Sequence, residues 1–170
     1  MHIRAATPTD IAAILAIWNP VIRDSDMTFN SQEKTPTLLG EELGGKAKNT
    51  HPFLLACAGS DLLGFATYGQ FRASNGYAHT MEHTIILAPD ARGKGIGRSL
   101  IDALEAHARH HQVHSMIAGI SHANTRGLAF HAACGYREIA RLPEVGFKFN
   151  RWYDLILMQK RLSPLSGTAI

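Results

Sequence analysis

The stretch MEHTIILAPDARGKGIGRSLIDALEAHA, residues 81–108, changes its pattern once, and that change decides the fold. Residues 81–88 form a short, mostly apolar segment, which predicts a strand. Pro89-Asp90-Ala91 ends the strand, and a run containing three glycines follows. Beyond the glycines, apolar residues repeat at helical spacing, namely Leu100, Ile101, Leu104 and Ala108. The sequence therefore predicts a strand, a tight turn and a helix in direct succession.

The turn itself, Arg92-Gly93-Lys94-Gly95-Ile96-Gly97-Arg98, indicates an anion site. Glycines permit a tight turn whose backbone N–H groups are not covered by a Cβ atom. The helix expected to follow the turn, near Ser99, adds its unpaired N–H groups and the positive end of its dipole. Three basic side chains surround the turn, so a phosphate or pyrophosphate ligand is expected.

The spacing of the glycines excludes two common phosphate motifs. The P-loop needs four residues between its first Gly and a Gly-Lys pair, and that pattern is absent. The dinucleotide fingerprint needs its third glycine three positions after the second, whereas Gly97 follows Gly95 by two. What remains is Arg-x-x-Gly-x-Gly between a strand and a helix. On spacing alone, a glycine-rich connection without any ligand is an open alternative.

The elements on either side predict an α+β fold with a mixed, largely antiparallel sheet, and exclude a doubly wound one. A helical N-terminal part leads into an antiparallel meander, which is followed by strand, helix, strand, helix and strand. The strands are expected at 3–5, 53–58, 62–70, 81–88, 115–120, 138–140 and 152–158. The helices are expected at 8–18, 36–48, around 100–108 and at 124–134, with 21–35 irregular.

Length and composition favour one globular domain over residues 1–162, with 163–170 as a flexible tail. The chain has 170 residues, 45% of them apolar, and a net charge of +3, with scattered basic residues that do not favour a nucleic-acid partner. The N-terminal region carries neither a membrane span nor a signal peptide pattern. Cys57 and Cys134 are too few for a disulfide framework and are expected in the core. Together these features predict a cytoplasmic protein without a membrane partner.

Two motifs together resemble those of the GNAT superfamily of N-acetyltransferases. Arg92, Gly95 and Gly97 match the pyrophosphate loop for acetyl-CoA, and Asn124-x-x-Gly127-x-x-Phe130-His131-x-x-x-Gly135-Tyr136 resembles the second signature. The resemblance extends from Ile3 to Met158 and implies a GNAT-like sheet flanked by helices on both faces. It implies acetyl-CoA as co-substrate and no metal. The residues expected to bind acetyl-CoA are Ile86, Leu87, Ala88, Arg92, Gly93, Lys94, Gly95, Ile96, Gly97, Arg98, Ser99 and Asn124.

Further segments resemble the phosphinothricin acetyltransferase-like subfamily. These are residues 72–77, Glu82-His83-Thr84 and the run GFKFNRWYD at 146–154. Members acetylate the amino group of phosphinothricin, methionine sulfone or methionine sulfoximine and usually form homodimers. The resemblance thus implies a small-molecule amine as acceptor, direct transfer in a ternary complex without an acyl-enzyme, and a homodimer.

Glu82 and His131 are the candidate catalytic residues. Glu82 precedes the phosphate turn on its strand and is expected to take the ammonium proton as general base, directly or through water. A solvated or ion-paired glutamate is the alternative. His131 stands where many GNAT enzymes have a tyrosine, so its imidazolium is expected to protonate the departing thiolate. A buried, hydrogen-bonded histidine is the alternative. A backbone N–H of residues 85–88 is expected to stabilise the oxyanion.

Arg72 is the candidate clamp for a carboxylate or phosphinate on the acceptor, because guanidinium forms bidentate pairs with such groups. An exposed loop arginine is the alternative. Asn124 is expected either to contact the pantetheine arm or to cap the helix that it begins. Further candidates for shaping the amine pocket are Phe29, Tyr77, Lys148 and Trp152.

The spacing of four histidines is compatible with a metal site, but the rest of the sequence does not favour one. His107, His110, His111 and His114 follow helical spacing, but the strand expected at 115–120 ends the helix before His114. We therefore expect an exposed polar helix end and no metal. Two other function classes are alternatives to an acetyltransferase for small amino acids: a non-catalytic acyl-CoA-binding sensor and a peptide N-terminal acetyltransferase.

Overall fold

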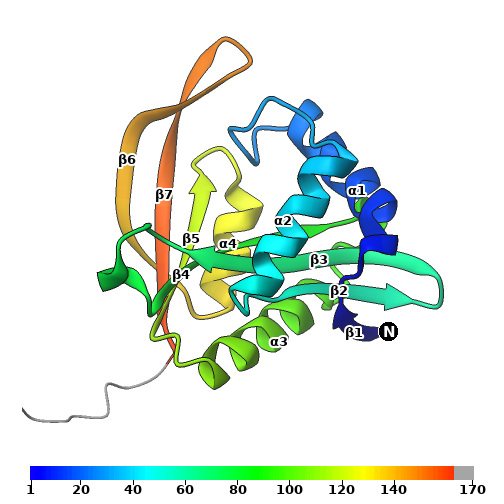
Figure 1. Cartoon of the computed structure of the whole chain (residues 1–170). Helices are drawn as coiled ribbons and strands as arrows, with labels where there is room; N and C mark the ends of the chain where they lie inside the picture. The colour runs from blue at the N-terminus through cyan, green and yellow to red at the C-terminus, as the bar shows by residue number, and fades with distance from the viewer. Residues whose placement is uncertain (163–170) are drawn as a thin grey trace, which may run out of the picture.

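The computed structural model describes residues 1–162 as one seven-stranded sheet with helices on both faces (Figure 1). The strands are β1 (His2–Ala5), β2 (Phe53–Ala58), β3 (Asp61–Gln70), β4 (Thr80–Leu87), β5 (Ser115–Ser121), β6 (Arg137–Lys148) and β7 (Arg151–Arg161). The α-helices are α1 (Ile11–Asp24), α2 (Pro36–Lys48), α3 (Ile96–His110) and α4 (Thr125–Ala133), with short 3-10 turns η1 (Pro8–Asp10), η2 (Asn75–Tyr77) and η3 (Pro89–Ala91). The tail expected over 163–170 lies outside the described residues.

The sheet is mixed and largely antiparallel, as the sequence predicts. Its order is β1-β2-β3-β4-β5-β7-β6, and of the neighbouring pairs only β4 and β5 run parallel. The helix α3 makes the crossover between these two strands. The predicted fold class is therefore confirmed.

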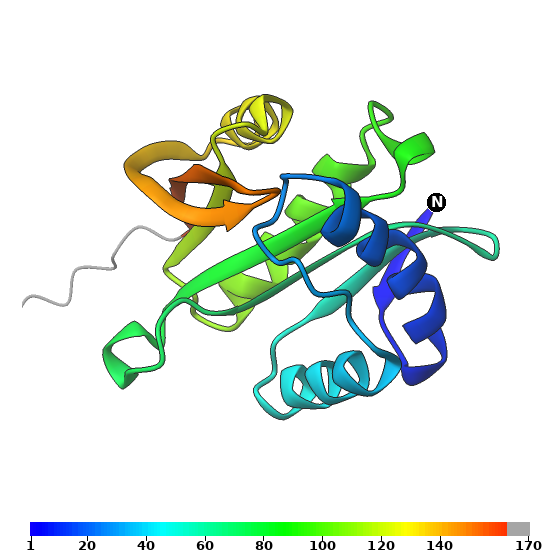
Figure 2. The same ribbon diagram turned by 90° about the horizontal axis from the view of Figure 1, so that it is seen from above.

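Two apolar clusters form the core, one on each face of the sheet. Helices α1 and α2 pack on one face against residues such as Leu55 and Phe65, and α3 packs on the other against Ala56 and Ala66 (Figure 2). Neighbouring strand residues thus serve opposite faces, as the pleat of a strand requires. Leu100 on α3 is fully buried, and such a side chain stabilises a fold by about 1.5–3 kcal/mol.

Strands β4 and β5 separate in the middle of the sheet. They pair only over Thr80–Glu82 and Ser115–Ile117, although β4 continues to Leu87 and β5 to Ser121. Figure 1 shows the two strands spreading beyond that point. The separation opens the sheet directly before the glycine-rich turn and gives a ligand access to backbone groups of β4.

The last two strands are much longer than expected. Pro143 and Gly146 suggest a break after 138–140, but β6 continues through both with two register shifts. Pro143 lies in the second shift, between Leu142 and Gly146, where β6 is not paired with β7, so its missing N–H costs no ladder bond. Phe149 and Asn150 both have positive φ, 50° and 58°, and close the hairpin as a two-residue turn.

Helix α1 also extends beyond its expected end at Trp18. It continues through Pro20 to Asp24, so the predicted irregular segment 21–35 begins four residues too early. Val21 and Ile22 face the core and are nearly fully buried, and this packing outweighs the hydrogen bond that the proline removes. The segment between α1 and α2 remains irregular from Ser25 onward.

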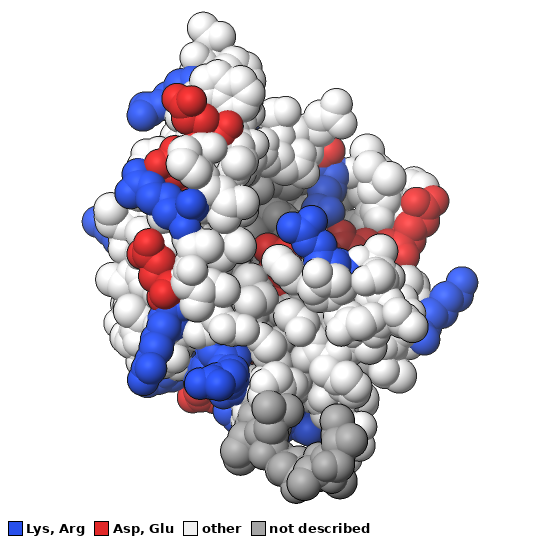
Figure 3. Space-filling model, turned by 90° about the vertical axis from the view of Figure 1, so that its left-hand side faces the viewer, with Lys and Arg blue, Asp and Glu red and all other residues white. Residues whose placement is uncertain are grey.

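The face drawn in Figure 3 carries mixed charge: lysine and arginine side chains lie beside acidic ones there and are not gathered in one basic patch. No helix within residues 1–162 is both long and apolar enough to cross a membrane. Cys57 and Cys134 are free thiols and lie in the core, as predicted.

Candidate active site

The glycine-rich turn adopts backbone angles that need glycine. Gly93 and Gly95 have φ of 73° and 77°, and Gly95 caps the start of α3. A side chain at either position would strain the left-handed backbone. The free N–H groups of the first helical turn follow immediately, so the local backbone offers the donors that an anion would need.

Gly97 has a different role, because it lets three elements approach closely. A Cβ at this position would lie 3.1 Å from the Phe130 ring on α4 and 3.3 Å from Leu87 on β4. The glycine thus allows the start of α3 to pack against α4 beside the end of β4.

A cavity of about 540 Å³ lies between the end of β4 and α4, next to the turn. We call it the Arg92 cavity. Its walls are mostly apolar, and Arg92 and Arg126 add two cations. The residues that line it are Met27, Ile85, Ile86, Leu87, Arg92, Gly93, Asn124, Arg126, Gly127, Phe130 and His131. A long apolar arm that ends in phosphates fits this combination.

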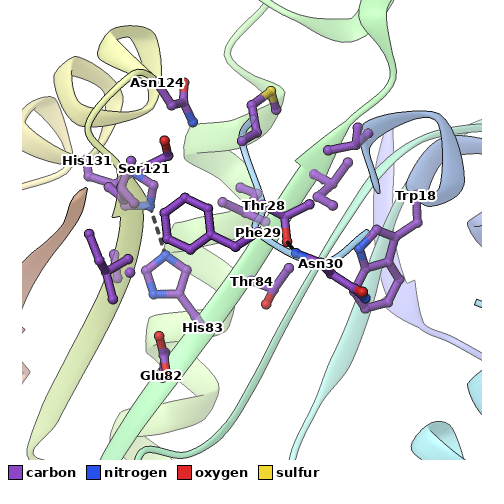
Figure 4. A pocket seen from close by; sticks show the side chains of 18 of the residues that line it. Trp18, Thr28, Phe29, Asn30, Glu82, His83, Thr84, Ser121, Asn124 and His131 are labelled. Carbon is purple, nitrogen blue, oxygen red and sulfur yellow. Dashed lines mark hydrogen bonds between the residues drawn. The ribbon is translucent and has the colours of Figure 1, made fainter. Parts of the chain in front are cut away.

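A second cavity, of about 430 Å³, opens on the other side of the same wall (Figure 4). We call it the Glu82 cavity. Its lining combines the loop after α1 with β4, β5 and the start of α4. The residues shared with the Arg92 cavity are Met27, Ile85, Ile86, Asn124 and His131. The two cavities therefore meet at the point where β4 and β5 have separated.

Backbone N–H groups of β4 face this junction. Ala88 N donates to Leu63 O at 2.9 Å, so its N–H points toward β3. Because N–H groups alternate sides along a regular strand, those of Ile85 and Leu87 point away from β3 and toward the gap. Either is a fixed hydrogen-bond donor for an oxygen that enters the junction.

Glu82 lies at the wall of its cavity, on the last residue of β4 that pairs with β5. Its side chain is partly exposed, but Oε1 lies directly over Gly119 of β5, where a Cβ would come within 2.7 Å. Desolvation raises the pKa of Glu82 above its usual value, and the positive charge of Arg72 works in the opposite direction. The carboxylate is therefore a better proton acceptor than an ordinary surface glutamate.

Gly119→Ala should displace the Glu82 carboxylate without unfolding the protein, because the atom in its way is the end of a flexible side chain. We expect kcat to fall about tenfold or more, since small misplacements of reacting groups are costly. Gly44→Ala is the matched control, because a Cβ there meets nothing within 4 Å. Steady-state kinetics and thermal melting of both variants check this. Unchanged kcat in Gly119→Ala would contradict the placement of the carboxylate.

His131 lies in the wall that the two cavities share, and both of its ring nitrogens have partners. Its Nδ1 donates to Gly127 O at 2.7 Å, and its Nε2 lies 3.0 Å from Nε2 of His83 (Figure 4). The ring is 6% exposed, and burial lowers the pKa of His131. These surroundings favour the neutral ring over the imidazolium that the sequence analysis expects. They match the alternative stated there, a buried and hydrogen-bonded histidine.

The predicted acceptor residues divide into those at the cavity and those away from it. Phe29 lines the Glu82 cavity. Arg72 is exposed and does not line it, yet its charge reaches Glu82 and its guanidinium lies 5.1 Å from the Phe71 ring. Tyr77 is 42% exposed and contacts the same ring. The loop after β3 thus stands at the rim.

Lys148 and Trp152 do not reach the cavity. The Lys148 ammonium is buried and donates to the carbonyl oxygens of Ile22, Ser25 and Thr28. It holds the loop after α1 and leaves no donor for a substrate. Trp152 is 55% exposed on the β6–β7 hairpin and contacts Phe147. Neither side chain lines either cavity, so the structure does not bring these two predicted acceptor residues together with Phe29 and Glu82.

Asn124 caps a helix and also lies in the walls of both cavities. Its Oδ1 accepts from Gly127 N at 2.9 Å and caps α4, and the residue also lines both cavities. Ile86, Leu87, Arg92 and Gly93 line the Arg92 cavity as well. The remaining predicted acetyl-CoA residues form the turn and the start of α3 without lining either cavity, namely Ala88, Lys94, Gly95, Ile96, Gly97, Arg98 and Ser99.

The sequence analysis missed several residues of the site. Met27 comes from a segment without periodicity, so no pattern points to it. His83 follows Glu82 directly and would be expected on the opposite face of the strand, yet it contacts His131 of α4. Arg126 lies within the second motif but is not one of its signature positions, so the sequence does not point to it. In the structure it is exposed.

The histidines near the end of α3 form no arrangement for a metal. The helix ends at His110, so His114 lies outside it, as predicted. His107 and His111 stack with ring centroids 4.1 Å apart, and Tyr68 Oη lies 2.9 Å from His107 Nδ1. Within the described chain, no three His, Cys, Asp or Glu side chains are placed to hold a metal ion.

Comparisons with known proteins agree with this geometry. Residues 3–157 match the family model described as an acetyltransferase (GNAT) domain. The chain is 36% identical over 166 residues to an L-methionine sulfoximine/L-methionine sulfone acetyltransferase of Pseudomonas aeruginosa, with 95% of each protein covered.

Two solved structures are similar over nearly the whole chain. A phosphinothricin acetyltransferase of Sinorhizobium meliloti in complex with acetyl-CoA superimposes with a TM-score of 0.92 at 28% identity, covering 99% of this chain and 91% of that one. A ribosomal-protein-alanine N-acetyltransferase of Brucella melitensis has a TM-score of 0.92 at 37% identity, covering 95% and 99%.

Proposed function

The chain belongs to the GNAT acetyltransferase family, and we propose that it transfers the acetyl group of acetyl-CoA to the α-amino group of a small amino acid. The acceptor is of the methionine sulfone, methionine sulfoximine or phosphinothricin type. The observation that carries this proposal is the junction of the two cavities. The Arg92 cavity begins at an anion-binding turn, and the Glu82 cavity contains a carboxylate with a raised pKa.

In the proposed reaction, acetyl-CoA occupies the Arg92 cavity with its thioester at the junction. Glu82 takes a proton from the ammonium group, directly or through water, and the free amine attacks the carbonyl carbon. The N–H of Ile85 stabilises the oxyanion, because it is fixed and points into the gap. As the C–S bond then breaks, the attacking nitrogen loses its second proton to water or to the departing sulfur, so that a neutral N-acetyl product forms and coenzyme A leaves as thiolate or thiol. Transfer is direct, since the cavities adjoin and both substrates can bind at once.

Arg72 is proposed to hold the carboxylate or phosphinate of the acceptor at the rim of the Glu82 cavity. The positive charge of Arg72 is the second influence on the pKa of Glu82, and guanidinium forms bidentate pairs with carboxylates and phosphinates, which supports this role. Arg72→Ala should therefore raise the KM of the amino acid about tenfold, the loss of one charged pair, and leave the KM of acetyl-CoA unchanged. Arg72→Lys keeps the charge without the bidentate geometry, so its KM for the amino acid should lie between the values of the wild type and of Arg72→Ala. Equal effects on both KM values would contradict this role.

A peptide N-terminal acetyltransferase is the second candidate, because one similar structure is a ribosomal-protein-alanine N-acetyltransferase. The Glu82 cavity argues for the smaller acceptor. The loop after α1 covers it with Phe29, and Lys148 fixes that loop to β6. A cavity closed in this way suits an amino acid better than an extended chain. A non-catalytic acyl-CoA sensor, the third class, would not need a carboxylate with a raised pKa there.

We also propose that the protein is a cytoplasmic homodimer. Five large apolar side chains are about half exposed on the β6–β7 hairpin, namely Ile139, Val145, Phe147, Phe149 and Trp152. Such a cluster on one hairpin is typical of an interface. Two free buried thiols suit a reducing compartment. Sedimentation velocity of the wild type and of Phe147→Ser/Trp152→Ser tests the dimer: a monomer in both would contradict it.

The experiment that tests the function is coenzyme A release from acetyl-CoA across a panel of amines. The panel includes methionine sulfone, methionine sulfoximine, phosphinothricin, ordinary amino acids and a peptide with an N-terminal alanine. The proposal predicts release with the first three and an N-acetyl product by mass. Release with the peptide alone would support the second candidate, and acetyl-CoA binding without release on any amine would support the sensor.

A further inference from the structure

The contact between His83 and His131 determines where the protons of both rings lie. The two Nε2 atoms are 3.0 Å apart, and both side chains are at least 93% buried. One Nε2 must carry the proton of that hydrogen bond, and the other must accept it. Which ring donates follows from the partners of the two Nδ1 atoms.

Those partners differ. Nδ1 of His131 lies 2.7 Å from Gly127 O, and a carbonyl oxygen only accepts, so this nitrogen carries a proton. Within residues 1–162, Nδ1 of His83 makes no hydrogen bond of normal distance and angle, so a proton there would be a buried donor without a well-placed acceptor. The protons of a neutral pair therefore lie on Nδ1 of His131 and on Nε2 of His83, and His83 donates to His131.

We propose that His83 is a positioning residue: its Nε2–H holds His131 as the neutral Nδ1–H tautomer, so that the wall between the two cavities carries no charge. The assignment of this tautomer rests on the hydrogen bonds alone. Its consequence for the enzyme rests on the proposed function.

Burial outweighs the groups that would stabilise a positive charge on the pair: the backbone of Ile117 acts to raise the pKa of His83, and that of Gly127 acts to raise the pKa of His131. Tyr136 faces both rings, with centroids at 5.3 and 5.5 Å, and burial raises its pKa, so it is neutral. Glu82 is the neighbour of His83 on β4, but within residues 1–162 no carboxylate is hydrogen-bonded to either ring. Burial lowers the pKa of His83 to about 3, with the nearby His131 as a further cause, and also lowers that of His131.

A neutral wall suits an ammonium acceptor. The two cavities already contain basic side chains, with Lys34 in the Glu82 cavity and Arg92 and Arg126 in the Arg92 cavity. An imidazolium at the junction would add a fourth positive charge beside the incoming ammonium group and repel it. Removing the donor of His83 leaves the Nε2 lone pair of His131 free to take a proton, so the pKa of His131 should rise.

The test is nitrogen-15 NMR of the histidine rings in the full-length protein without ligand, from pH 8 down to pH 5. His131→Phe identifies the signals of His131. The wild type should show His131 protonated at Nδ1 and bare at Nε2, and His83 with the reverse pattern. The wild-type spectra need no variant to fold. His131 as an imidazolium or as the Nε2–H tautomer at pH 7 would overturn the proposal.

Two variants separate the hydrogen bond from packing. His83→Met removes the donor and should raise the pKa of His131 by about one unit toward its ordinary value. His83→Gln can still donate an N–H from the position of Nε2 and should keep the wild-type titration. A His131 titration that is the same in His83→Met as in the wild type, or that shifts equally in both variants, would overturn the role of His83. An absence of turnover in the wild type would refute the proposed function and leave the spectra valid.

Discussion

Replacing Glu82 with glutamine is expected to lower kcat about 100-fold at neutral pH while leaving the Kd of acetyl-CoA unchanged. Glutamine keeps the size of the side chain and its position over Gly119, but its amide cannot accept the ammonium proton. The loss should appear in kcat because proton removal belongs to the chemical step. Steady-state kinetics and acetyl-CoA titration measure the two quantities.

The pH dependence provides the second part of this prediction. Desolvation raises the pKa of Glu82, so the carboxylate is protonated, and inactive as a base, up to a higher pH than an ordinary glutamate. The rate should increase with pH through this raised pKa, and Glu82→Gln should lose that limb of the profile. If the variant kept wild-type turnover and the same limb, Glu82 would have no part in the mechanism.

Replacing Lys148 with methionine is expected to affect both stability and acceptor binding. The buried ammonium binds three carbonyl oxygens of the segment from Ile22 to Thr28, and methionine fills similar space without any donor. Leaving these acceptors without their charged partner should cost roughly 2–3 kcal/mol of unfolding free energy. Urea unfolding of the variant measures this loss.

The same change should raise the KM of the amino acid, because the loop that Lys148 holds supplies Thr28, Phe29 and Asn30 to the Glu82 cavity alone. We expect an increase of about tenfold, equivalent to about 1.4 kcal/mol of binding energy. Lys48→Met, an exposed lysine at the end of α2, is the matched control and should change neither quantity. Normal stability and normal KM in Lys148→Met would show that the three hydrogen bonds do not hold the loop.

The strand, glycine turn and helix at 81–108 could be predicted from sequence because local chemistry specifies each part. A short, mostly apolar run marks β4, a helical period marks α3, and glycines mark the left-handed backbone at Gly93 and Gly95. The phosphate end of the site follows from these residues alone. Glu82 could be placed near the junction because it lies on the same strand.

Other features depend on partners distant in sequence and could not be found in this way. From the sequence, Lys148 is predicted as a cation that binds the substrate. The structure shows that its ammonium instead binds carbonyl oxygens of residues more than 100 positions earlier in the chain. The length of β6 depends on its pairing with β7, which leaves Pro143 unpaired in a register shift. The state of His131 depends on His83, which approaches from another element. In each case, tertiary contacts override the local signal.

The most direct test of the account is an initial-rate experiment in which acetyl-CoA and methionine sulfone are varied together. Two adjoining cavities with a shared wall predict that both substrates bind before any product leaves, so the double-reciprocal lines should intersect. Intact mass of the enzyme after incubation with acetyl-CoA alone should show no added acetyl group. Parallel lines together with an acetylated enzyme would contradict direct transfer across the junction.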